Sequence, residues 1–146
     1  MKNIIIILSI ILLSFSVSCS KSKSSDSKFK IGILQLVEHP ALDDANRGFV
    51  DGLKEEGFED GKNIIIDYQN AQGEQANCIT IAQKFINDRS DLILAVATPA
   101  AQAVANLTKD IPILITAVTD PADAKLVADN NLPGGNVTGT SDLTPV

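Results

Sequence analysis

The sequence is poor in the residues that build metal and catalytic centres. Its 146 residues include one histidine, two cysteines, one tyrosine and no tryptophan. The histidine, His39, stands far from the second cysteine, Cys78, so the two form no cluster with the spacing of metal ligands. We therefore predict that the protein binds no metal ion, and that Cys78 is a small buried residue of a helix.

The signatures of common nucleotide-binding proteins and hydrolases are absent as well. The chain contains no Gly-x-Gly-x-x-Gly fingerprint, no Walker loop and no Gly-x-Ser-x-Gly elbow. Lysine and arginine total 12 against 18 acidic residues, and this acidic balance argues against a nucleic-acid partner. These absences predict a protein without a cofactor, without catalytic residues and without nucleic acid.

The first 18 residues have the composition of a signal peptide. Lys2 precedes an apolar run, residues 4–13, which only Ser9 interrupts, and small residues follow it. The run is shorter than a membrane-spanning helix requires, so a signal peptide is the better interpretation. The sequence therefore predicts an extracytoplasmic protein, with residues 1–18 as its export signal.

Cys19 directly follows Ser16, Val17 and Ser18, where the bacterial lipobox has its lipid-modified cysteine. Ser16 stands where leucine is usual. We expect Cys19 to carry a lipid anchor, and a signal peptide cut elsewhere with an incidental cysteine is the alternative. Residues 19–28, which are rich in serine and lysine, would form a flexible tether to the cell membrane.

The remaining chain alternates strand and helix patterns joined by short connections, which is typical of α/β domains with a parallel sheet. Right-handed crossovers predict an open, doubly wound sheet in the order 2-1-3-4-5 within residues 29–140. We expect strands at 29–37, 62–68, 92–97, 113–118 and 136–140, and helices at 41–56, 74–88, 100–109 and 122–129.

A strand-cap-helix pattern occurs twice, at Thr98-Pro99 and at Asp120-Pro121. Thr or Asp at an N-cap accepts a backbone N–H, and proline at the first helical position has no N–H to leave unpaired. Two helices would begin side by side at the carboxyl edge of the sheet, where their free N–H groups favour an anionic group. Local capping alone is the simpler role for Thr98 and Asp120.

Five stretches match short sequence motifs of one family. They are Gln-Leu-Val-Glu-His-Pro-Ala-Leu-Asp (35–43), Gln-Asn-Ala-Gln-Gly-Glu (69–74), Ala-Thr-Pro-Ala-Ala-Gln (97–102), Ala-Val-Thr-Asp-Pro (117–121) and Pro-Gly-Gly-Asn-Val-Thr-Gly-Thr-Ser-Asp (133–142). In this order they resemble the substrate-binding lipoproteins of ABC importers, in the group associated with aromatic amino acids such as tryptophan. That group has the type I periplasmic-binding-protein fold.

This resemblance implies one lobe of a two-lobed protein that closes on its ligand by a hinge and delivers it to a membrane permease. The implied ligand is an amino acid, with an aromatic one favoured, and no enzymatic activity is implied. Residues 141–146 would begin the crossover to a second lobe that this chain lacks. The residues expected to face the ligand are Glu38, His39, Thr98, Pro99, Ala100, Thr119, Asp120, Ser141 and Asp142.

Several of these residues have alternative roles. A ligand carboxylate could accept N–H bonds from the helix starts while Glu38 or Asp120 pairs with the ligand ammonium. His39 could instead act only within a turn, and the pair Asp43 and Asp44 is expected to be a solvated first turn of a helix. A ligand-sensing module that reports to a signalling partner is the alternative function. A flavodoxin-like enzyme is a more remote one, because no acid-base pair or nucleophile is recognisable.

Overall fold

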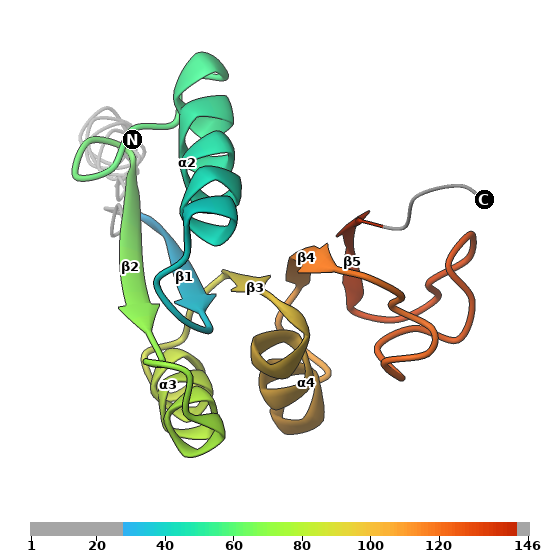
Figure 1. Cartoon of the computed structure of the whole chain (residues 1–146). Coiled ribbons are helices and arrows are strands. Elements are labelled where there is room, and N and C mark those ends of the chain that lie inside the picture. Colours follow the sequence, from blue (N-terminus) through green and yellow to red (C-terminus); the bar gives the residue numbers. More distant parts are fainter. Residues whose placement is uncertain (1–27, 143–146) are drawn as a thin grey trace, which may run out of the picture.

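The computed structural model describes residues 28–142 (Figure 1). The predicted signal peptide, Cys19, most of the tether and residues 143–146 lie outside the described residues. The described part contains the strands β1 (Phe29–Gln35), β2 (Ile64–Asn70), β3 (Leu92–Val96), β4 (Ile113–Val118) and β5 (Val137–Ser141), and the helices α2 (Pro40–Glu55), α3 (Gln75–Asn87) and α4 (Thr98–Leu107).

The strands form one parallel sheet in the order β2-β1-β3-β4-β5, which confirms the predicted doubly wound α/β fold. Helix α2 lies on one face of the sheet, and α3 and α4 lie on the other (Figure 1). A parallel sheet covered in this way buries both faces of its central strands. Strand β3 is an example, since Ile93, Leu94, Ala95 and Val96 are all buried.

The face under α3 and α4 carries the larger group of buried side chains. Leu34 of β1 packs there with Phe85 of α3 and Val104 of α4. Gly32 of β1 allows this packing, because a Cβ at that position would lie 2.6 Å from the ring of Phe85. The buried side chains of the opposite face, under α2, are Ile31, Ile33, Ile64, Leu94 and Val96.

The predicted strands and the first three predicted helices lie within two residues of the observed ones. Strand β2 begins at Ile64 because a turn precedes it. Asn63 closes this turn by accepting the N–H of Glu59 at 2.8 Å and donating its side-chain amide to the carbonyl of Gly57 at 2.8 Å.

The predicted helix at residues 122–129 is wrong, because the chain forms successive turns there. The N–H of Ala122 donates to Asp120 Oδ1 at 3.0 Å and to Asn130 Oδ1 at 2.9 Å. Lys125 has a φ of 58°, a left-handed conformation that does not continue an α-helix. Asp120 and Asn130 bind an N–H that would also lack a partner in the first turn of a helix, so the helical path is broken at Lys125.

Within residues 28–142, no helix combines the length and the apolar content that crossing a lipid bilayer requires.

Candidate functional site

The predicted ligand-facing residues meet along one edge of the sheet, which we call the rim. Glu38 and His39 connect β1 to α2, and Thr98, Pro99 and Ala100 open α4 after β3. Thr119 and Asp120 follow β4, and Ser141 and Asp142 stand at the end of β5. Because these strands are parallel and adjacent, their carboxyl ends bring all nine residues to the same edge.

His39 is the N-cap of α2. Its Nδ1 accepts the N–H of Ala41 at 3.2 Å, and its carbonyl accepts the N–H of Leu42 and of Asp43, each at 2.9 Å. His39 therefore has the local role in a turn that was its alternative in the sequence analysis. Since Nδ1 is used as an acceptor, Nε2 is the ring nitrogen left for any contact at the rim.

Gln35 is a rim residue that sequence reasoning missed. Its side chain is fully buried at the end of β1, and its Nε2 donates to the carbonyl of Val37 at 2.9 Å and to Asp43 Oδ1 at 2.6 Å. These bonds tie the β1–α2 loop to the first turn of α2. Asp43 is thus half-buried and bonded, whereas a solvated position was predicted. The signal in the sequence that could have revealed this role is a glutamine inside an otherwise apolar strand.

Two buried side-chain oxygens near this loop have no hydrogen-bond partner among the described residues. They are Oε1 of Gln35 and Oδ1 of Asn46, which lies on α2 one turn after Asp43. A buried acceptor without a partner costs free energy, so both oxygens are exceptions to the rule that buried polar atoms are paired.

The start of α4 differs from its prediction. Thr98 is the first helical residue and the N-cap is Ala97, so the predicted capping by the Thr98 side chain is wrong. Ala97 has a φ of 83°, and its N–H donates to the carbonyl of Thr116 on β4 at 3.0 Å. The positive-φ turn at Ala97 directly follows Val96, the last residue of β3, so α4 begins earlier than predicted. Thr98 and Pro99 are half-buried, whereas Ala100 is fully buried.

Asp120 caps the turn after β4, as its local interpretation predicted. Its Oδ1 accepts from the side-chain amide of Asn130 at 2.9 Å and from the N–H groups of Asp123 and Ala122 at 3.1 and 3.0 Å. The hydrogen bond from Asn130, followed by those two backbone bonds, lowers the pKa of Asp120. The carboxylate therefore stays charged at neutral pH and retains Oδ2 for a second partner.

The remaining rim residues are exposed. Glu38, Thr119, Ser141 and Asp142 all have largely accessible side chains. The N–H of Asp142 donates to the carbonyl of Val118 at 3.1 Å, which holds the end of β5 against the end of β4. The rim thus combines carboxylates, hydroxyls and the N-terminus of α4, which are groups that can bind both ends of a zwitterion.

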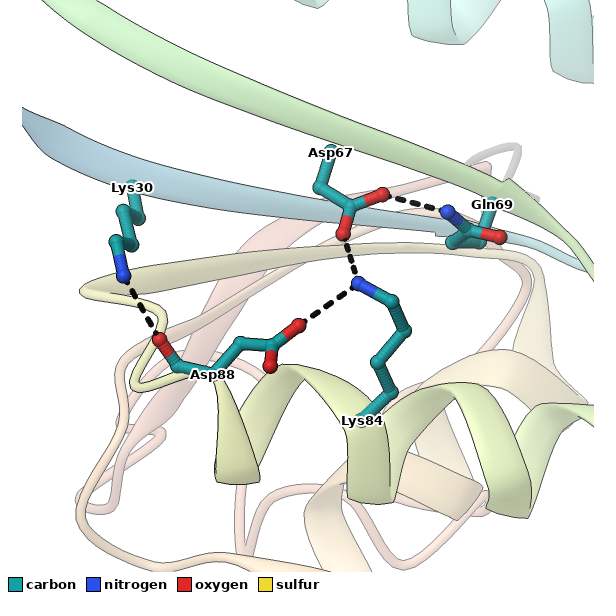
Figure 2. A network of polar contacts seen from close by, with 5 residues as sticks. All are labelled: Lys30, Asp67, Gln69, Lys84 and Asp88. Carbon is teal, nitrogen blue, oxygen red and sulfur yellow. Dashed lines mark hydrogen bonds and ion pairs between the residues drawn. The ribbon is translucent and has the colours of Figure 1, made fainter.

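Other polar groups lie away from the rim and join structural elements (Figure 2). Lys84 of α3 contacts both Asp67 of β2 and Asp88, and the Nζ of Lys30 donates to the carbonyl of Asp88 at 3.0 Å. Burial alone would raise the pKa of Asp67, but hydrogen bonds from Lys84 and Gln69 outweigh it and lower that pKa. This network fastens α3 to β1 and β2.

Cys78 is buried in α3, as predicted, and burial raises the pKa of its thiol. Among residues 28–142 there is no group of three or more His, Cys, Asp or Glu side chains that could hold a metal ion.

Residues 30–146 match the family described as ABC transporter substrate binding protein. The chain belongs to this family. The resemblance that the five sequence motifs indicated is confirmed. The family consists of substrate-binding proteins and not of enzymes.

Two solved structures are similar to this family member. A substrate binding protein with adhesive properties from Clostridium difficile, in its ligand-free, open form, is 59% identical, with a TM-score of 0.78 over 80% of this chain. An ABC domain in complex with L-Trp from Streptococcus pneumonia is 47% identical, with a TM-score of 0.77 over 82% of this chain. A curated relative, the tyrosine-binding protein of Clostridioides difficile (strain R20291), is 55% identical over 124 residues, or 84% of this chain.

The chain spans less than half of each of these relatives. It covers 36% of the tyrosine-binding protein and 40% of each of the two solved chains. The five-stranded sheet and its rim therefore correspond to one part of the fold of the substrate-binding proteins.

Proposed function

We propose that this chain forms one lobe of an extracytoplasmic solute-binding protein that delivers an aromatic amino acid to an ABC importer. The observation that carries the proposal is the rim, where nine residues implied by the family resemblance stand together at the carboxyl edge of one sheet. Ligands of open α/β sheets bind at that edge. A second lobe of the full-length protein would supply the opposite wall of the cleft.

The chemistry of the rim suits an amino-acid zwitterion. The N–H groups in the first turn of α4 have no partner within the helix and favour the ligand carboxylate. The free Oδ2 of Asp120, or the exposed carboxylate of Glu38, suits the ligand ammonium. Tyrosine and tryptophan are the preferred candidates, because two relatives are described as binding one or the other.

The delivery part of the proposal rests on the N-terminal sequence. Residues 1–18 are the proposed export signal, Cys19 the proposed lipid anchor and residues 19–28 the tether. A lipid-anchored binding protein stays close to the membrane permease that receives its ligand. Mass spectrometry of the membrane fraction tests the anchor, since a Cys19→Ser variant should lose the added lipid mass.

Calorimetry tests the ligand. The chain is joined to the remaining part of the Clostridioides difficile tyrosine-binding protein, and this fusion is titrated with L-tyrosine, L-tryptophan and, as a control, L-lysine. We expect heat with at least one aromatic amino acid and about tenfold weaker binding for Asp120→Asn, because a charge-assisted hydrogen bond is lost. Asp51→Asn on the exposed side of α2 is the matched control. A fusion that folds by circular dichroism but gives no heat with either aromatic amino acid overturns the proposed ligand.

A further inference from the structure

The long segment between β4 and β5, residues 119–136, closes on itself around one of the rim carboxylates. Asp120 stands at its start, and Asn130 follows 10 residues later. The side-chain amide of Asn130 donates from Nδ2 to Asp120 Oδ1 at 2.9 Å, and its Oδ1 accepts the N–H of Ala122 at 2.9 Å. Both polar atoms of this amide are therefore used to hold Asp120 in the loop.

Hydrogen bonds, and not packing, fix this loop at the rim. Asn130 is exposed, and it lines a hollow of about 270 Å³ between the loop and the strands β4 and β5. On the side of α4, the amide of Gln102 donates to the carbonyl of Ala124 at 3.0 Å. The loop is thus fastened to the helix whose N-terminus is the proposed site for the ligand carboxylate. Both ends of a zwitterion would meet groups that are held in place before the ligand arrives.

The two carboxylates that suit the ligand ammonium differ in how firmly they are held. Glu38 is exposed, so its flexible side chain would lose rotamer freedom on binding. Asp120 Oδ1 already accepts three hydrogen bonds, which fixes the carboxylate and leaves Oδ2 available. The bond from Asn130 is also the largest cause of the lowered pKa of Asp120, so this carboxylate stays ionised. Binding to an ordered, charged group costs less conformational entropy.

We propose that Asn130 is a positioning residue that makes Asp120, and not Glu38, the group that binds the ammonium of the ligand. This role rests on the proposed function, and it decides between the two carboxylates that the proposed function leaves open. A fixed and ionised carboxylate requires a cationic group in the ligand, because it otherwise loses water without gaining a partner. The site therefore selects α-amino acids over the corresponding acids that lack the ammonium.

Calorimetry on the fusion described above tests the role of Asn130, with the aromatic amino acid that binds as the titrant. Asn130→Ala should weaken binding about fivefold, because the hydrogen bond that holds Asp120 is lost. Asn131→Ala is the matched control, since this neighbouring asparagine lines the same hollow and its side chain does not bond to Asp120. The control should bind like the unmodified fusion. Equal affinities of the two variants overturn the proposal.

A double-mutant cycle shows whether Asn130 acts through Asp120. In the Asp120→Asn background, Asn130→Ala should cost almost nothing further, because no carboxylate is left to hold. A further loss of about fivefold in that background would mean that Asn130 supports binding by another route, against the proposal. Glu38→Gln should weaken binding less than Asp120→Asn does. The reverse order assigns the ammonium to Glu38 and also refutes the proposal.

An analogue of the ligand tests the selectivity. 3-(Indol-3-yl)propionate and 3-(4-hydroxyphenyl)propionate keep the ring and the carboxylate of tryptophan and tyrosine but lack the ammonium. We expect the unmodified fusion to bind the matching analogue at least about a hundredfold more weakly than the amino acid. Equal binding of analogue and amino acid would contradict recognition of the ammonium by Asp120.

A measurement on the chain alone separates the role of Asn130 from the proposed function. If the fusion does not fold, or folds and binds neither aromatic amino acid, NMR titration of the Asp120 carboxyl group still tests the contact. The pKa of Asp120 should rise toward its ordinary value in Asn130→Ala and stay lowered in Asn131→Ala. A fusion without binding would count against the proposed ligand, whereas an unchanged pKa in Asn130→Ala overturns the role of Asn130 whatever the ligand is.

Discussion

Two side chains at the rim use only one of their polar atoms to cap local structure. His39 uses Nδ1 to cap α2, and Asp120 uses Oδ1 to hold the turn after β4. In each case another atom, Nε2 of His39 or Oδ2 of Asp120, is left for an outside partner. Capping and ligand binding are therefore compatible roles at both positions. The sequence predicted which residues reach the rim, because strand order places them there, but not which atoms remain available, because that depends on local hydrogen bonds.

Gln35 is the residue whose role can be tested most directly. In a Gln35→Glu variant, a fully buried carboxylate would face Asp43 Oδ1, which now accepts a hydrogen bond from Gln35 at 2.6 Å. Two carboxylates cannot share this contact unless one is protonated. We expect the variant to lose about 2 kcal/mol of stability at pH 7, measured by urea unfolding. The loss should shrink as the pH falls toward 4, since protonation restores a donor.

Gln83→Glu is the matched control, because Gln83 is exposed on α3 and bonds to Asn87. Its stability should change little between pH 7 and pH 4. A loss for Gln35→Glu that is the same at both pH values would mean that the proximity to Asp43 does not matter.

The lowered pKa of Asp120 predicts how the stability of the folded protein changes with pH. The hydrogen bond from Asn130, with those from the N–H groups of Asp123 and Ala122, lowers its pKa from the usual 3.8. A carboxylate with a lowered pKa in the folded state stabilises the protein above its unfolded pKa, and this contribution is lost as the pH falls through the folded pKa. At pH 7 the Asp120→Asn variant should unfold at a lower temperature than the unmodified chain. Thermal scans from pH 7 downward should show the difference shrinking below about pH 4, and a constant difference would contradict this origin.

At the scale of elements, regular patterns were predicted well and their ends poorly. The apolar runs of β3 and β4 and the helical spacing of α2 and α3 predict their own structure, since burial on the sheet requires these periodicities. The start of α4 was mispredicted because Ala97, whose N–H donates to Thr116 of β4, turns the chain with a positive φ, so α4 already begins at Thr98. The segment 122–129 has a helical composition, but Lys125 takes a left-handed conformation, and the side chain of Asn130 binds Asp120 and Ala122 across the loop. These are contacts across the fold or across a loop, which a local pattern does not contain.

The packing of α3 on β1 depends on the absence of a side chain at Gly32. A Gly32→Ala variant would place its Cβ 2.6 Å from the ring of Phe85, which is fully buried. Overpacking of this kind typically costs about 1 to 3 kcal/mol. We expect a loss of this size in urea unfolding. The double variant Gly32→Ala, Phe85→Leu should recover part of it relative to Phe85→Leu alone, and strictly additive losses would contradict a direct clash.

At the scale of the whole molecule, the chain has a rim at one edge of the sheet and a helix, α2, without a buried residue on one face. The rim was predicted from the sequence because parallel strands end together. The exposure of α2 was not, because an apolar position in α2 looks the same whether its partner is inside or outside this chain. Both features agree with a chain that represents about two fifths of its relatives.

Ligand stabilisation should therefore depend on the part of the structure beyond this chain. A ligand that binds only the folded state stabilises it by about 2.7 kcal/mol at 100 times its dissociation constant, which raises the unfolding midpoint by several degrees. At about 1 mM L-tyrosine or L-tryptophan, the fusion should show such a rise and the chain alone should show almost none, because the rim provides one wall of the cleft. L-Lysine at the same concentration is the control for both proteins. A rise of equal size in the chain alone and in the fusion would mean that the rim is a complete site, and the proposal that a second lobe contributes to binding would have to be given up.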